Sequence, residues 1–388
     1  MSRAAVAGRG LLLAVLALVL AGCGMEYPQS SVDPKSDFAQ SIHFLYVLIF
    51  WITLVILVLT WGAMTYIMVK FRARPDSPKP RQIHGHLGME LAWTVIPAII
   101  VVAIAIPTIQ TVFRTQRPAG PDTFMVDVIG HQFWWEFRYP DGTVTANDLR
   151  LPVGVPVALR LHSVDVIHSF WVPQLGGKRD VNPLVAPPGE EEAGETSEAA
   201  EDPAAVAAET GRYNYLYFTI SEPGIYRGQC AEFCGSSHSL MGVRVIAQTP
   251  DEFEQWLASW RGPAVDTTAA DSAVVQAAGE IGGGGAARIE LGRQTFHSAS
   301  CVACHAIQGT SAAGRVGPDL TLYGQRQTVA GWLENTPDNL VRWITAPQSV
   351  KPNSKMPGSA EAGGNFPPTN LSEEQVRAVA EYLWSLGK

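Results

Sequence analysis

At 388 residues the chain is too long for one ordinary domain, so we expect two or three folded units. Its 47% apolar content includes two long uncharged runs near the start, which is typical of a membrane protein with soluble parts. The net charge of -8 is local, because residues 189–210 hold eight acids and no base. The rest of the chain is close to neutral, and we expect no nucleic-acid partner.

The N-terminal segment is predicted to be a processing signal. Arg3 and Arg9 precede the apolar run LLLAVLALVL, whose ten residues are too short to span a bilayer. The stretch LAGC ends at Cys23, and small residues before a cysteine resemble a bacterial lipoprotein signal. We therefore expect residues 1–22 to be removed and Cys23 to be lipidated. An ordinary signal peptide with an incidental cysteine is the alternative.

Two apolar stretches predict a transmembrane hairpin within residues 23–115. The first stretch, about residues 44–69, carries no charge and is longer than the roughly 20 residues that a spanning helix needs. The loop after this stretch has an excess of lysine and arginine, which is typical of a cytoplasmic loop. The second stretch, about residues 91–113, then crosses back. Its two prolines leave backbone carbonyl groups without donors, and we expect neighbouring helices to satisfy these groups. Everything after about residue 115 is expected outside the cytoplasm.

The first outer unit, residues 120–261, is predicted to be an antiparallel β-sandwich or barrel. It contains short β-type runs, such as TFMVDVIG, FWWEFRY, VPVALRLH and YNYLYFTI, separated by turn residues. An insertion at residues 184–210 interrupts this unit, and its low-complexity acidic composition predicts a disordered surface loop.

A second outer unit is predicted beyond a linker. Residues 262–285 have few large apolar side chains and end in glycines, as a flexible linker does. Residues 286–388 lack alternating strands, and a capping box from Ser372 to Gln375 opens an amphipathic run. This unit is therefore predicted to be mainly helical.

The pentapeptide CVACH in the helical unit is the attachment signature of a c-type heme. In that chemistry Cys301 and Cys304 bond the vinyl groups, and the adjacent imidazole of His305 ligates the iron. A local disulfide is the alternative for an exported pair of cysteines. The export signal and a helical unit of about a hundred residues favour heme.

The sixth heme ligand is predicted from the residue types present after His305. Met356 is the single methionine beyond that position and there is no further histidine, so a His/Met pair is expected. Lys351 and Lys355 are alternatives. The whole unit resembles a class I cytochrome c.

The stretch QCAEFCGSSHSLM, residues 229–241, concentrates soft metal ligands. Cys230, Cys234 and His238 have a spacing that a zinc site or a local disulfide would also allow. Met241 adds a thioether, which zinc seldom uses and copper accepts. Two thiolates on one tight turn can bridge two coppers that share one electron, with a histidine capping each metal.

The second capping histidine must come from elsewhere in the fold. The upstream candidates outside the membrane are His131, His162 and His168. The residues alone leave this choice open.

The segments SVDVIHSFWVPQLGGKRDVNP and GIYRGQCAEFCGSSHSLMGV resemble subunit II of heme-copper cytochrome c oxidases, over roughly residues 40–260. The resemblance implies a two-helix transmembrane hairpin, a cupredoxin-like antiparallel β-barrel and, as in the caa3-type oxidases, an all-α class I cytochrome c domain. It also implies the ligands of a dinuclear CuA centre: His168, Cys230, the backbone carbonyl of Glu232, Cys234, His238 and Met241.

Two carboxylates acquire further roles from the same resemblance. The side chain of Glu232 would reach a magnesium ion shared with subunit I. Glu90 would lie at the cytoplasmic entrance of a proton path, although an acid at a helix start is also stabilised by the helix dipole.

The resemblance implies electron transfer in aerobic respiration. Electrons from a cytochrome c or a cytochrome bc complex would pass through heme c and CuA to heme a and the oxygen-reducing centre of subunit I, coupled to proton translocation. The partners would be subunits I and III and membrane lipid, in a bacterial cytoplasmic membrane with the copper and heme domains on its outer face. A CuA-bearing nitric oxide reductase subunit and a copper carrier are alternatives, and the CxxCH unit argues against a carrier. Phe133 stands where many relatives have a tryptophan, so we expect donors to reduce the C-terminal heme instead of reaching copper there.

Overall fold

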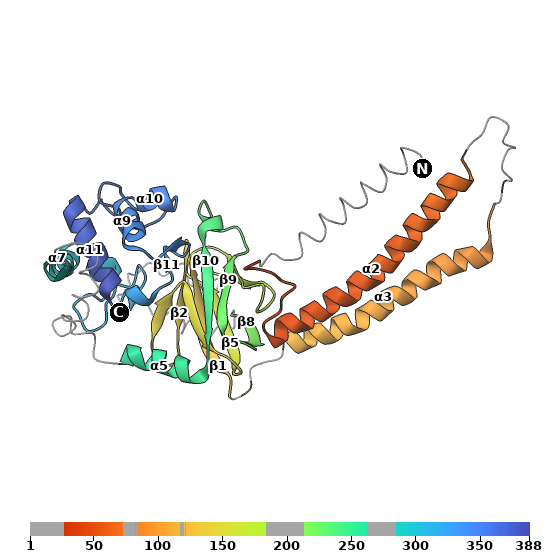
Figure 1. Cartoon of the computed structure of the whole chain (residues 1–388), viewed down its shortest axis with the longest axis horizontal. Helices are drawn as coiled ribbons and strands as arrows, with labels where there is room; N and C mark the ends of the chain where they lie inside the picture. The colour runs from red at the N-terminus through yellow and green to blue at the C-terminus, as the bar shows by residue number, and fades with distance from the viewer. Residues whose placement is uncertain are drawn as a thin grey trace, which may run out of the picture.

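The computed structural model describes residues 27–72, 82, 84–116, 120, 122–183, 213–261 and 285–388. The predicted signal with Cys23, the acidic insertion at 184–210 and the linker up to residue 284 lie outside the described residues. Figure 1 shows three parts in a row: a helical hairpin, a β domain, and a helical domain that carries the C-terminus.

The hairpin consists of α2 (Asp37–Lys70) and α3 (Leu87–Thr115). The two helices are long and apolar enough to cross a membrane, with mean hydropathy values of 2.7 and 2.3 in their most apolar windows. Helix α2 begins before its apolar run, because Ser36 caps it by accepting the N–H of Ala39 and Phe38 packs against Gly176 and Gly177 of the β domain. The hairpin is therefore joined to the β domain by packing as well as by sequence.

Two five-stranded sheets form the β domain, in the orders β3-β2-β1-β5-β8 and β4-β10-β9-β6-β7. The strands of the first sheet are β1 (Phe124–His131), β2 (Trp134–Arg138), β3 (Val144–Ala146), β5 (Pro156–Ser163) and β8 (Asn214–Thr219). Those of the second are β4 (Asp148–Pro152), β6 (His168–Trp171), β7 (Arg179–Val181), β9 (Gly224–Cys230) and β10 (Gly242–Gln248).

The predicted cupredoxin-like architecture is confirmed, with one difference in strand pairing. Most neighbours are antiparallel, but β1 pairs with β5, and β4 with β10, in parallel. Parallel neighbours need a crossover connection, and here the chain crosses between the two sheets. The core lies between the sheets and is filled by alternate residues of the strands, such as Val126 and Val128 of β1 and Leu159 and Leu161 of β5.

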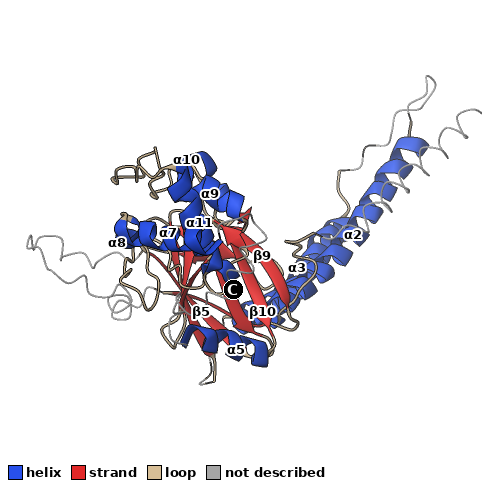
Figure 2. Ribbon diagram, turned by 60° about the vertical axis from the view of Figure 1, so that its left-hand side comes forward, coloured by secondary structure: helices blue, strands red, loops and turns tan. Residues whose placement is uncertain are grey.

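The C-terminal domain is helical, as predicted. Its helices are α7 (Gly285–Ser298), α8 (Cys301–Cys304), α9 (Pro337–Thr345), α10 (Pro347–Val350) and α11 (Glu373–Ser385), with the short strands β11 (Thr328–Val329) and β12 (Leu333–Glu334). Figure 2 shows these helices in one group, with α5 (Pro250–Arg261) of the β domain set apart. Gly292 permits close packing of α7 on α11, because a Cβ there would lie 2.0 Å from the carbonyl oxygen of Ala378. The predicted capping box at Ser372 is present.

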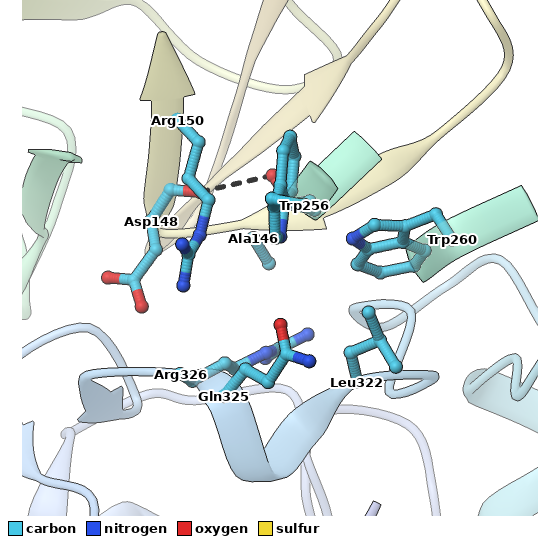
Figure 3. Close-up of a pocket in the computed structure, with 9 residues that line it drawn as sticks. Ala146, Asp148, Arg150, Trp256, Trp260, Leu322, Gln325 and Arg326 are labelled. Carbon is cyan, nitrogen blue, oxygen red and sulfur yellow. Dashed lines mark hydrogen bonds between the residues drawn. The ribbon is translucent and has the colours of Figure 1, made fainter. Parts of the chain in front are cut away.

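The helical domain docks directly on the β domain. Figure 3 shows Asp148 and Arg150 of β4 facing Gln325 and Arg326 of the helical domain across a small pocket. The backbone N–H of Gln327 donates to Asp148 Oδ2 at 2.7 Å. Specific polar contacts of this kind fix one orientation of the two domains.

Candidate metal centres

Two buried thiols and one imidazole meet at one end of the second sheet. Cys230 ends β9, and its Sγ lies 3.9 Å from that of Cys234 and 3.9 Å from Nδ1 of His168. His168 opens β6, which pairs with β9 so that Phe170 lies opposite Cys230. The ligand atoms of these three residues lie within 4.8 Å of one another. Strand pairing therefore brings together residues that are 62 positions apart.

Three further donors surround the thiols. The carbonyl oxygen of Glu232 lies 3.2 Å from Cys230 Sγ, Nδ1 of His238 lies 3.7 Å from Cys234 Sγ, and Sδ of Met241 lies 3.9 Å from that same sulfur. All six donors that the resemblance implied are thus gathered around one point.

The other two upstream histidines lie elsewhere. Nε2 of His131 is 3.0 Å from the carboxylate of Glu136, and the ring of His162 packs edge-on against Tyr213. Among the three candidates, His168 is the one that lies beside the thiols.

The electrostatics of the two cysteines suit a cation. The hydrogen bond that they share holds the pKa of Cys230 well below its ordinary value, while that bond and the repulsion of a neighbouring thiolate raise the pKa of Cys234. Both thiols are buried. A bound metal cation would stabilise a second thiolate at this distance. The donor set of two thiolates, two imidazoles, a thioether and a carbonyl fits copper.

Asp165 holds His168 in the orientation that ligation needs. Its Oδ1 lies 2.9 Å from Nε2 of His168, so that nitrogen donates to the carboxylate and Nδ1 faces the thiols. Burial alone would raise the pKa of Asp165, but hydrogen bonds from His168 and from the N–H groups of Gln132 and Val166 lower it to about 2. We did not predict this residue from sequence, although an acid three positions before a candidate histidine ligand was a usable signal.

The CVACH motif borders a mostly apolar cavity of about 270 Å³. Cys301, Cys304, His305 and Met356 all line it, together with large apolar side chains of the helical domain: Phe296, Leu320, Trp343, Ile344, Val379 and Leu383. The two thiols are free, as are Cys230 and Cys234. An apolar cavity bordered by two thiols, an imidazole and a thioether fits a covalently bound heme.

Neighbouring groups orient both candidate axial ligands. Nδ1 of His305 donates to the carbonyl oxygen of Pro318 at 2.8 Å, which leaves Nε2 for iron. The amide of Gln348 donates to the carbonyl oxygen of Met356 at 3.0 Å and also to those of Ser354 and Ala362. Gln348 therefore fixes the backbone conformation on both sides of Met356.

The β domain closes one side of the heme cavity. Gln132, Phe133, Trp134 and Asp165 line it from that side. Phe133 is 4% exposed, and its carbonyl oxygen accepts a hydrogen bond from Nζ of Lys351 in the helical domain. Phe133 is thus buried within the chain: it belongs to the core of the β domain, and its carbonyl group bonds to the helical domain.

The side chains of the two acids with implied roles are not among the groups that line these centres. Glu90 is in the first turn of α3, and its Oε1 accepts the N–H of His86 at 3.1 Å, which is a capping contact. Glu232 lies between the two cysteines, and its side chain is exposed while its carbonyl oxygen faces Cys230.

Three family models match successive parts of the chain. Residues 24–111 match the transmembrane domain of cytochrome c oxidase subunit II, residues 203–248 match its periplasmic domain, and residues 289–387 match cytochrome c.

Curated relatives match over nearly the whole chain. Cytochrome c oxidase subunit 2 of Alkalihalophilus pseudofirmus is 35% identical over 98% of this chain and 97% of the relative. The protein of the same name from Bacillus sp. strain PS3 is 30% identical over 97% of this chain and 96% of the relative. Among solved structures, the periplasmic domain of subunit II of cytochrome oxidase from Bradyrhizobium japonicum is 22% identical, with a TM-score of 0.29, over 37% of this chain and 96% of that one.

The fold and these matches define a membrane-anchored cupredoxin-type protein that carries its own cytochrome c domain. The cytochrome c match implies heme, and the subunit II match implies copper. The chain belongs to the cytochrome c oxidase subunit II family, as a fusion of the caa3 type.

Proposed function

We propose that this chain accepts electrons from a cytochrome c or a cytochrome bc complex on the outer face of a bacterial cytoplasmic membrane. It delivers them to subunit I, where oxygen is reduced and the reaction is coupled to proton translocation. The observation that carries the proposal is the convergence of six donors around two thiols, near a mostly apolar cavity that the CVACH motif and Met356 border. Relatives named as oxidase subunits across the whole chain favour this function over a nitric oxide reductase.

The copper ligands in this proposal are the six residues that meet around the thiols. His168 and His238 would each offer Nδ1, Cys230 and Cys234 would offer their thiolates, and Met241 would offer its thioether. The carbonyl oxygen of Glu232 completes the set. The donors come from a paired strand and a tight loop, so they are held in place before any metal binds.

Cys301 and Cys304 would hold the heme covalently, and His305 and Met356 would ligate its iron. Heme and copper bound at these residues would supply one-electron transfer. The chain's own residues orient both centres, through Pro318 and Gln348 at the heme and Asp165 at the copper.

We further propose that outside donors reduce the C-terminal heme and do not reach copper at Phe133. Docking of the helical domain supports this route, because the backbone and ring of Phe133 are covered within the same chain. The covalent connection also raises the effective concentration of the heme domain at the copper domain.

The remaining roles are those of the family. Subunits I and III would pack with the hairpin, whose α2 and α3 expose apolar side chains suited to lipid or other helices. Glu90 would lie at a proton entrance, the Glu232 carboxylate would bind magnesium at the subunit I boundary, and Cys23 would carry lipid. The capping contact of Glu90 is compatible with a second role for its free carboxylate oxygen.

The test is to purify the chain with its oxidase and determine its metals and spectra. We expect two coppers and one covalent heme in this chain, with a copper signal from one unpaired electron delocalised over both metals. A single zinc, or a mononuclear copper spectrum, would refute the dinuclear assignment.

A further inference from the structure

A loop of the helical domain, residues 351–355 (the heme-domain loop), touches residues 230–241, which carry five of the six candidate copper ligands (the copper-binding loop). The hydroxyl of Ser237 donates to the carbonyl oxygen of Pro352 at 2.6 Å, and the amide of Asn353 donates to Oγ of Ser236 at 2.7 Å. Ser237 is fully buried and directly precedes the candidate copper ligand His238. The candidate heme ligand Met356 comes directly after the heme-domain loop. The two candidate centres are therefore connected through a short polar contact.

Lys351, at the start of this loop, is buried where the two domains meet. Lys351 is 3% exposed to solvent. Nζ donates to the carbonyl oxygen of Phe133 in the β domain at 2.5 Å and to that of Ala330 in the heme domain at 2.7 Å. One ammonium group thus bonds the backbones of both domains.

A lysine is an unusual choice for a buried position. Burying an ammonium group away from water carries a large desolvation cost, and lysine is almost never fully buried unless it is paired. A methionine or leucine would fill the same space without that cost, but it would leave the two carbonyl groups without a donor. An apolar side chain at residue 351 would fill space only. The lysine also bonds both carbonyl groups and so fixes the position of one domain against the other.

Lys355, in the same loop, offers a comparison. Its Nζ lies 3.9 Å from Oδ2 of Asp165, and its side chain is 58% exposed. An exposed ion pair at this distance contributes little to an interaction. The loop thus contains two lysines of equal charge, of which one bonds to the interface and the other remains mostly in water.

We propose that Lys351 is a positioning residue that holds the heme-domain loop, residues 351–355, against the copper-binding loop. This arrangement places Met356 so that electrons pass from the heme domain to the copper domain. The inference rests on the proposed function, because it assigns a residue to a step of that function. Lys351 acts through the backbone of Phe133 and the Ser237–Pro352 contact, without being a ligand of either centre.

The test compares Lys351→Met with Lys355→Met in the full-length chain within the assembled oxidase. The heme is reduced with a light-triggered donor, and the subsequent reduction of copper is monitored by its optical absorption. In Lys351→Met we expect the heme-to-copper rate to fall by at least about tenfold, which corresponds to about 1.4 kcal/mol. Heme reduction by soluble cytochrome c, both metal spectra and the metal content should be unchanged. Lys355→Met should transfer electrons at nearly the parent rate.

Hydrogen–deuterium exchange of the same proteins provides a readout apart from electron transfer. Amides at residues 132–134 and 330–331 should exchange faster in Lys351→Met and remain as in the parent in Lys355→Met. If Lys351→Met does not assemble, the double variant Ser236→Ala, Asn353→Ala removes a neighbouring contact of the same loop and should also slow the transfer.

Three results would overturn the proposal: an unchanged rate in Lys351→Met or in the double variant that replaces it, equal slowing in both lysine variants, or slowing that accompanies loss of a metal signal. Failure of the proposed function is recognised separately. In that case the parent chain itself would show copper reduced by the outside donor before the heme, whatever the variants do.

Discussion

Replacing Asp165 by asparagine should weaken copper binding while the fold is retained. In the parent, Oδ1 of Asp165 accepts hydrogen bonds from Nε2 of His168 at 2.9 Å and from the N–H of Val166 at 2.7 Å. Oδ2 accepts the N–H of Gln132 at 2.7 Å. Asparagine has nearly the same shape but presents an NH₂ group in place of one oxygen. Whichever way the amide turns, at least one N–H donor then faces another donor.

The expected magnitude can be worked from these contacts. A part-buried donor that loses its acceptor costs about 1–3 kcal/mol. Loss of a group that orients a metal-binding histidine lowers metal affinity by about 10- to 100-fold, which corresponds to about 1.4–2.7 kcal/mol. The two estimates agree, so we expect Asp165→Asn to bind copper about 10- to 100-fold more weakly than the parent.

The assay is competition for copper between the purified protein and a chelator of known affinity. Asp180→Asn is the matched control, because Asp180 is an exposed acid on β7, which pairs with β6, the strand of His168. Its affinity should equal that of the parent, since it removes the same charge without touching a ligand. Equal copper affinities in the parent and Asp165→Asn, with His168 still bound to the metal, would refute the reasoning.

Three other predictions test the centres and the route. Cys230→Ser and Cys234→Ser should each abolish the delocalised copper signal measured by paramagnetic resonance, and survival of that signal in either variant would contradict bridging by both sulfurs. Met356→Ala should lower the heme potential in a redox titration and remove the sulfur-to-iron absorption band, because a thioether ligand favours the reduced iron; an unchanged band would mean that the ligand is another residue. Truncation at residue 270 should leave both coppers bound but reduce turnover with the natural donor strongly, and full turnover would show that donors reach copper beside Phe133.

Local patterns predicted much of this molecule. The apolar runs predicted the helices α2 and α3, although α2 begins earlier because Ser36 caps it and Phe38 packs on the β domain. The capping box at Ser372 predicted the start of α11. Alternation predicted the strands but not the parallel pairing of β1 with β5, since periodicity within a strand does not specify its neighbour.

By itself the sequence determined the membrane-spanning helices, the CxxCH motif and the candidate metal ligands between Cys230 and Met241, because each is a local pattern of neighbouring residues. Three features depended on the tertiary structure: that His168 and not His131 or His162 lies beside the thiols, that Asp165 orients it, and that Lys351 joins the two domains. Lys351 and Phe133 are 218 positions apart. Such contacts depend on which strands pair and which domain surfaces are complementary, and these are properties of the whole packed chain.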